Sequence, residues 1–366
     1  MTDERESSPA SGWRTFTDWR VLLGFGVTVF LLWWVLRGVD FGEVLLRIRE
    51  ADYLLLTLAV AISTAGFLVR AMRWDVFLRP VRRGTGLRSR FASVSVGFMA
   101  NNLLPLRIGE FARAYALARM EPVSMSGAFG SLVVERFFDA FTILLLLVIA
   151  VAAPGFPDDA MLGGRPVGSV VNGMAVLVGV VLLGLVVLVL WPKRLVRVFE
   201  AVAMRVLPAD SRRRIVDSLE AFLEGVTSLR SPRLLALALI WSVGFWCWHT
   251  LGFWVGFRAF GIEASYLAAL FMNAIIAFAV AIPSSPGFFG TFHAGVTLAL
   301  VGVFGVAEGP ALAYAFGFHL AAFIPITVIG LWYVWRLGLS IAEIEESEER
   351  VEAAVEQEHP VPEVER

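Results

Sequence analysis

Long apolar runs, separated by short polar, glycine- and proline-rich or arginine-rich segments, occupy most of the chain. A helix needs about 20 apolar residues to cross a hydrocarbon core of about 30 Å. The runs that approach or exceed this length are 21–36, 53–69, 126–153, 170–191, 234–257 and 311–335. Shorter runs form two pairs that each flank a proline-containing break, 91–104 with 108–120 and 266–282 with 291–306. The pattern predicts an all-α polytopic membrane protein with about eight membrane segments plus re-entrant, broken-helix hairpins.

The order of these runs is the same in two halves, about 18–153 and 169–336: span, surface helix, span, broken hairpin, span. The first half starts inside and the second starts outside. This pattern predicts an inverted-topology repeat, with a ligand site near the midplane where the two broken elements meet. The breaks at 105–111 (PLRIGEF) and 286–292 (PGFFGTF) share Pro, Gly and Phe at equal spacing. If the second break is instead a plain turn between two full spans, the repeat survives but that site becomes a surface loop.

The polar segments set the expected domain boundaries. Residues 1–17 form a polar N-terminal tail, 18–340 the membrane domain, and 341–366 a glutamate-rich tail that we expect to be disordered. Asp40, followed three residues later by Glu43, resembles a capping box that opens a short amphipathic surface helix. The insertion 193–232 predicts interfacial helices on the cytoplasmic side.

Composition and charge agree with this class. Of the 366 residues, 58% are hydrophobic and 17% charged, which excludes an ordinary soluble enzyme. Arginines follow the run 53–69 closely and indicate the cytoplasmic side by the positive-inside rule, with attraction to anionic lipid: Arg70, Arg73, Arg79, Arg82, Arg83, Arg88 and Arg90. We therefore expect a multi-pass protein of the cell (inner) membrane with both termini cytoplasmic. The single cysteine, Cys247, excludes an internal disulfide framework and a thiolate metal cluster.

The first break carries polar and charged residues inside an otherwise apolar stretch. A charge at the centre of a membrane helix costs about 2.5–3.5 kcal/mol, so such residues need a protein-enclosed or water-lined setting. Pro105 and Gly109 predict where one helix ends and the next begins. The candidate substrate-binding residues around this break are Asn101, Asn102, Arg107, Glu110 and Arg113. The asparagines could equally cap the broken helix.

The run 126–153 adds Glu135, Arg136 and Asp139, of which Glu135 and Asp139 share a helix face. Two interpretations remain open. These residues form a buried ion-pair network between helices, or they line a polar groove that accepts a charged head group. Arginine suits phosphate because its planar fork offers two donors to two oxygens.

Glycines and prolines predict the second break, and histidines follow it. The structural breaks expected here are Pro283, Pro286, Gly287 and Gly290. His249, His293 and His319 fall in membrane segments, where each is either a proton relay or a ring hydrogen-bonded to a neighbouring helix. Zinc-type spacing, a phosphate-binding glycine loop, a nucleophile elbow and HExxH are all missing from the sequence, so we expect no metal, no cofactor and no ATP hydrolysis.

The motifs NLLPLRIGE (102–110), Glu135-Arg136-x-x-Asp139 and Pro286-Gly287-x-x-Gly290 together resemble the flippase-like integral membrane family of the lysylphosphatidylglycerol synthase transmembrane domain. The likeness covers roughly residues 18–340. The resemblance implies movement of a lipid with a polar head group between leaflets, either a phospholipid or a lipid-linked saccharide. Three residues after the second motif's last glycine, Gly290, the chain has His293, where the family leads us to expect glutamate.

The sequence thus predicts a lipid translocase whose head-group groove is lined by arginine and glutamate. The competing hypothesis is a membrane-embedded glycosyl- or acyl-transferase that acts on a polyprenyl phosphate or a phospholipid, with Glu110, Glu135 or Asp139 as base. A non-catalytic scaffold is a third hypothesis. A separate lipid-modifying enzyme is a candidate partner, nucleic acid is not, and the sequence does not define an oligomeric state.

Overall fold

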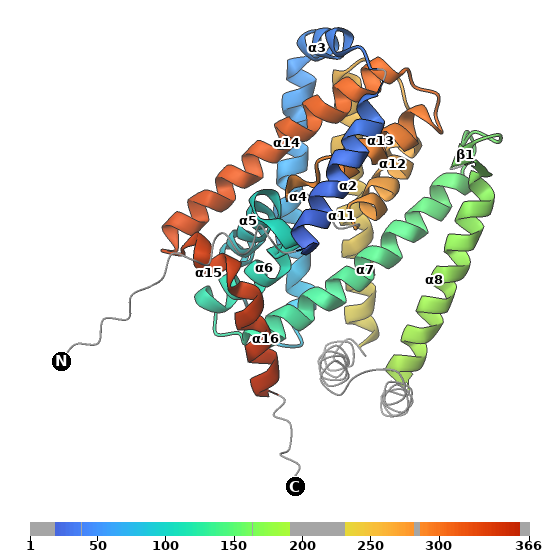
Figure 1. Cartoon of the computed structure of the whole chain (residues 1–366). Coiled ribbons are helices and arrows are strands. Elements are labelled where there is room, and N and C mark those ends of the chain that lie inside the picture. Colours follow the sequence, from blue (N-terminus) through green and yellow to red (C-terminus); the bar gives the residue numbers. More distant parts are fainter. Residues whose placement is uncertain (1–18, 38, 163, 191–230, 282–285, 359–366) are drawn as a thin grey trace.

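The computed structural model describes residues 19–37, 39–162, 164–190, 231–281 and 286–358. Apart from a two-residue ladder between β1 (Met161–Leu162) and β2 (Arg165–Pro166), the described elements are helices (Figure 1). The first half contains α2 (Trp19–Leu36), α3 (Phe41–Arg49), α4 (Tyr53–Leu78), α5 (Leu87–Leu103), η1 (Pro105–Arg107), α6 (Gly109–Met120) and α7 (Met125–Ala152). The second contains α8 (Val167–Leu190), α11 (Pro232–Ala259), α12 (Tyr266–Ala279), η2 (Pro286–Phe288), α13 (Thr291–Val296), η3 (Thr297–Val301), α14 (Glu308–Arg336), α15 (Ile341–Glu345) and α16 (Ser347–Glu358). The predicted interfacial helices of 193–232 and Pro283 lie outside the described residues, except for 231–232.

Three of the described helices, α4, α11 and α14, are long and apolar enough to cross a membrane. α4 lies along α11, and α14 lies along α5. α8 stands at the edge, beside α7 (Figure 1). The structure is therefore that of a helical membrane protein, as the hydropathy pattern predicts.

The surface helix predicted after the first span is α3. Asp40 begins it, because its side-chain oxygen accepts hydrogen bonds from the backbone N–H groups of Gly42 (2.8 Å) and Glu43 (3.3 Å). Asp52 caps α4 in the same way, through the N–H groups of Leu54 and Leu55. These caps fix the sharp change of direction between the two helices.

α4 is longer than the apolar run that predicted it, because the helix continues from Val69 to Leu78. Apolar residues of this extension pack into a core with α6 and α7, among them Trp74, Phe77 and Leu78, each at most 2% exposed. Arg70 and Arg73 lie on the same stretch and are buried. Their burial leaves them little contact with lipid, so the expected attraction to anionic lipid is wrong for these two arginines.

The first break joins two closely packed helices. Gly97 of α5 faces Gly109 of α6, and a Cβ on either residue would overlap the other's carbonyl oxygen. Asn101 caps α6, since its Oδ1 accepts a hydrogen bond from the Gly109 N–H at 2.9 Å. The hairpin arms are thus held backbone to backbone, which only glycine permits at these two positions.

The chain beyond α14 is helical where a disordered tail was expected. Ile344, Ser347 and Val351 are at most 1% exposed, because α15 and α16 pack on α6 and α7. These three residues recur every three or four positions, an amphipathic stripe that the high glutamate content hides in the sequence. The prediction of disorder is wrong for residues 341–358.

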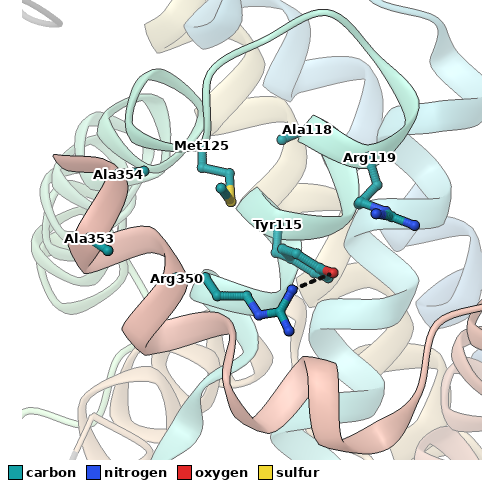
Figure 2. Close-up of a pocket in the computed structure, with 7 residues that line it drawn as sticks. All are labelled: Tyr115, Ala118, Arg119, Met125, Arg350, Ala353 and Ala354. Atoms are coloured by element: carbon teal, nitrogen blue, oxygen red, sulfur yellow. Dashed lines mark hydrogen bonds between the residues drawn. The ribbon is translucent and has the colours of Figure 1, made fainter. Parts of the chain in front are cut away.

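A cavity of about 430 Å³ lies between α6, the start of α7 and α16 (Figure 2). The Tyr115 hydroxyl donates to Glu343 at 3.2 Å and accepts from Arg350 at 3.3 Å. The hydrogen bond from the Ser340 backbone N–H lowers the pKa of the Glu343 carboxyl. These contacts tie the C-terminal helices to α6, one of the helices that carry the charged residues described below.

We expect Gly109→Ala to lower the free energy of unfolding by about 1–3 kcal/mol or more, because the new methyl group would overlap the backbone of α5. The measurement is unfolding by sodium dodecyl sulfate in mixed micelles. Gly244→Ala in α11 is the matched control, since a Cβ there meets nothing within 4 Å. It should be neutral or stabilise by up to about 1 kcal/mol. Equal effects of the two substitutions would contradict the close packing of α5 on α6.

Candidate functional site

Helices α4, α6 and α7 converge on a group of buried charges. We call this group the charged cluster, and its members are Arg70, Arg73, Arg113, Glu135, Arg136 and Asp139. α4 supplies two arginines one turn apart, α6 supplies Arg113, and α7 supplies the rest. The fold therefore brings together residues that lie up to about 70 positions apart in the sequence. Within a helix, their spacing places them on one face.

Glu135 is the centre of the charged cluster and is fully buried. Its two oxygens accept a bidentate pair of hydrogen bonds from Arg113, at 3.0 and 2.9 Å. Arg136 approaches at 2.6 Å, and Arg70 at 3.2 Å. Arg73 also lies 3.0 Å away. Such a carboxylate is held ionised by its neighbours, because an unpaired charge in this position would be very costly.

Asp139 lies one turn further along α7 and shares the same arginines. Arg73 contacts it at 2.5 Å and Arg136 at 3.1 Å. The indole N–H of Trp246, on α11, donates to the Asp139 carboxylate at 2.9 Å. This bond links the charged cluster of the first half to a helix of the second.

Aromatic rings line the guanidinium groups. Arg70 and Arg73 lie over the ring of Phe245 at 4.4 and 4.7 Å, and Arg113 lies over Trp74 at 3.9 Å. Trp74 is itself fixed by a hydrogen bond to Ser131. Cation–π contacts of this kind replace part of the lost hydration of a buried guanidinium.

The charged cluster carries more positive than negative charge. Its arginines number four and its carboxylates two. The Nε groups of Arg70, Arg73 and Arg113 have no hydrogen-bond partner among the described residues. An excess of buried guanidinium is costly unless an anion joins it, so the arrangement favours an anionic ligand.

One side of the charged cluster is open. The Arg136 side chain is 39% exposed, and Glu110 beside it is 29% exposed at a distance of 3.9 Å. Arg107 lies within electrostatic range of both. These three residues form what we call the rim, through which a ligand could reach the buried arginines.

The residues of the first break have separate tasks. Asn101 caps α6, as described above, and Asn102 donates to the Thr327 hydroxyl of α14 at 2.8 Å. Arg107 has a left-handed backbone (φ 58°) and donates to the Val280 carbonyl at the end of α12. Its guanidinium also lies 5.2 Å from the Phe288 ring. The break thus contacts the second half at three residues, and its asparagines have structural partners.

The second break turns at Pro286, Gly287 and Phe288, and Gly287 has φ 71°. Gly290 (φ 85°) precedes α13 and packs against the Thr28 backbone of α2. The turn η2 contacts η1. The two proline-containing breaks therefore meet in space.

The three histidines lie in different surroundings. His249 on α11 faces the Oδ1 of Asn273 at 3.2 Å. His293 and His319 face each other beyond the second break, with ring centroids 5.3 Å apart. Among the described residues, no group of three or more His, Cys, Asp or Glu side chains could hold a metal ion.

The sequence interpretation missed Arg70, Arg73, Phe245 and Trp246. The two arginines share a helix face three residues apart and are followed by Trp74, a signal that the amphipathic period continues past Val69. Trp246 and Phe245 gave no comparable signal, because an aromatic residue in an apolar run fits packing against lipid equally well.

Residues 21–330 match the model of the lysylphosphatidylglycerol synthase TM region family. The chain belongs to this family. Two relatives named UPF0104 membrane protein, both from Methanothermobacter thermautotrophicus, resemble it over most of their length. One is 23% identical over 327 residues, 86% of this chain and 90% of the relative. The other is 24% identical over 310 residues, 82% of this chain and 91% of the relative.

A third family relative is named Glycosyltransferase AglD, from Haloferax volcanii. It is 24% identical over 357 residues, which cover 90% of this chain and 56% of the relative. The predicted family is thus confirmed, and the chain is a multi-pass membrane protein of that family. Its relatives' names point to membranes and, in one case, to glycosyl transfer.

We expect Glu135→Gln to destabilise the protein by about 3–5 kcal/mol, because it leaves buried guanidinium groups without their shared carboxylate. Arg47→Gln in α3 is the control, since the Arg47–Glu43 pair is 48% and 49% exposed. Losing an exposed pair costs under about 1 kcal/mol. Denaturation in mixed micelles compares the two variants. A Glu135→Gln protein as stable as the wild type would show that the charged cluster does not depend on this carboxylate.

Proposed function

We propose that this protein moves a lipid with an anionic head group between membrane leaflets, and that the head group binds at the charged cluster. The observation that carries the proposal is the excess of buried guanidinium over carboxylate, open to one side at Arg136. A phosphate oxygen at the rim would accept hydrogen bonds from Arg136 and draw on the positive potential of Arg70, Arg73 and Arg113. The acyl chains would remain in lipid beside the apolar helices.

The charged cluster would lower the cost of carrying a charged head group through hydrocarbon. A head group crossing lipid alone loses its hydration, whereas one crossing along the charged cluster exchanges water for arginine hydrogen bonds. Glu110 and Glu135 occupy part of the guanidinium donors when no ligand is bound. A lipid phosphate arriving at the rim would take the place of these carboxylates as the partner of the guanidinium groups.

The repeat supports a way for the site to change exposure. Each half contains a short 3-10 turn that begins with proline and ends on a residue with positive φ, Arg107 (58°) and Phe288 (59°). We take these turns as equivalent elements of an inverted repeat with about eight membrane segments. Rocking of one half against the other about the contact between η1 and η2 would alternate access to the charged cluster.

We also propose an orientation in the cell membrane. The arginine-rich loop after α4 is tied to the end of α6 by the hydrogen bond from Gly86 N–H to Glu121. α16 packs on the same α6. By the positive-inside rule this end faces the cytoplasm, together with both termini.

A membrane-embedded glycosyl- or acyl-transferase is the second candidate, because one relative is named a glycosyltransferase. In that case the partly exposed Glu110 would act as base, and the arginines would hold a polyprenyl phosphate or a phospholipid. The matched region is 56% of that relative, so its printed name does not assign transfer to this region. A separate lipid-modifying enzyme would be the partner of a translocase.

Reconstitution in vesicles separates the two. Vesicles of phosphatidylcholine with phosphatidylglycerol contain a trace of fluorescent phosphatidylglycerol, and dithionite quenches the outer leaflet. A translocase raises the quenched fraction from about half towards completion, with lipids unchanged by mass spectrometry. A transferase instead yields a covalently altered lipid when a sugar or acyl donor is added. If phosphatidylglycerol and a panel of other anionic lipids show neither change, the proposed function is wrong.

We expect Arg136→Gln to slow this lipid exchange about tenfold or more. The variant loses the accessible guanidinium donor, and a hydrogen bond from such a charged group to the head group contributes about 1.5–3 kcal/mol of binding free energy. The control is Arg88→Gln, an exposed arginine in the first turn of α5. It should exchange lipid as the wild type does. If both variants exchange lipid equally, Arg136 does not lie on the path.

A further inference from the structure

His249 lies next to the charged cluster without belonging to it. Its ring contacts Trp246, at 5.7 Å between centroids, and Phe245, at 6.1 Å. The Trp246 indole N–H donates a hydrogen bond to Asp139, and the guanidinium groups of Arg70 and Arg73 lie over the Phe245 ring. One aromatic layer therefore separates the imidazole from the cluster's charges.

A hydrogen-bond chain fixes which ring nitrogen is free. The Asn273 amide donates to the Thr250 hydroxyl at 2.8 Å, which leaves its Oδ1 facing His249 Nδ1 at 3.2 Å. Thr250 in turn donates to the Trp246 carbonyl at 2.8 Å. An amide oxygen only accepts, so Nδ1 carries the hydrogen of the neutral ring and Nε2 is the basic nitrogen.

The charged groups that act on His249 come from two helices. α4 contributes Arg70, and α7 contributes Asp139. α12 contributes the neutral Asn273. α13 and α14 reach the neighbouring Phe253 through phenylalanines, Phe292 and Phe318. Among the described residues, these two helices place no charged side chain against the ring.

The charged cluster therefore acts on the protonation of His249 in addition to burial. Burial disfavours a charged ring and Asp139 favours one, but the positive charge of Arg70 beside the ring outweighs the negative charge of Asp139. An anion bound among the arginines cancels that charge. The same ring then gains a favourable setting for a proton on Nε2.

We propose that His249 is a proton-binding site coupled to the charged cluster, so that an anionic head group and a proton bind together. This inference rests on the proposed function, because it takes the charged cluster as the anion site. The proton is taken from bulk water. Coupling is reciprocal: the factor by which the anion favours the proton equals the factor by which the proton favours the anion. His293 and His319 are not needed for it.

Isothermal titration calorimetry tests the coupling on the full-length protein in detergent. The probe is dihexanoyl phosphatidylglycerol, titrated at one pH in buffers of different ionisation enthalpy. The slope of apparent enthalpy against buffer enthalpy gives the protons taken up per probe. We expect net uptake of up to one proton by the wild type. Affinity should fall as pH rises, by at most about tenfold per pH unit for one linked proton.

His249→Gln should bind the probe with no proton uptake and no pH dependence from this site. Its glutamine can still bond Asn273 but does not titrate. His249→Asn serves if the first variant unfolds at a lower temperature than the wild type. His319→Gln is the matched control, a ring on α14 that the charged cluster does not contact, and it should keep the uptake of the wild type.

The outcomes separate the two proposals. Uptake by His249→Gln equal to that of the wild type overturns the role of His249. Binding by the wild type without uptake overturns the coupling and leaves the anion site standing. Absence of binding by the wild type, across phosphatidylglycerol and phosphatidic acid probes, overturns the anion site and the coupling together.

Discussion

The fold depends on one constraint: two carboxylates and three guanidinium groups are buried together between α4, α6 and α7, with the partly exposed Arg136 beside them. Each of these groups alone would be far more stable in water. The structure holds them by bidentate geometry around Glu135, by the indole bond to Asp139 and by aromatic faces under the guanidiniums. The close glycine contact of α5 and α6, and the extension of α4 beyond its apolar run, serve to bring these side chains within hydrogen-bonding distance.

Buried ion pairs are weak contributors to stability, because desolvation offsets most of their attraction. Apolar residues of similar volume would pack the same three helices at lower cost. An unbalanced set of charges, with Arg136 at the surface of the charged cluster, is therefore what the proposed anion site would require.

Much of the helix pattern follows from the sequence, because hydropathy, caps and prolines act locally. Asp40 and Pro105 mark a helix start and a helix break that the structure places at the same residues. The charges of Glu135, Arg136 and Asp139 are equally visible. What the sequence does not reveal are pairings over long separations: Arg70 and Arg73 have the same local signal as a cytoplasmic arginine patch, and only the packing of α4 on α7 shows their partners. The glutamates of 343–358 likewise hide the stripe that docks α15 and α16.

The hydrogen bond from Arg107 to the Val280 carbonyl joins two residues that are synthesised at different times. The carbonyl of Val280 ends α12, where helix geometry leaves oxygen atoms without intrahelical donors, and the guanidinium that binds it comes from the other half of the chain. A ribosome produces Arg107 long before Val280 emerges. The donor that caps α12 is therefore synthesised well before the carbonyl it binds, whereas the cap of α6 at Gly109 comes from Asn101 of the same hairpin.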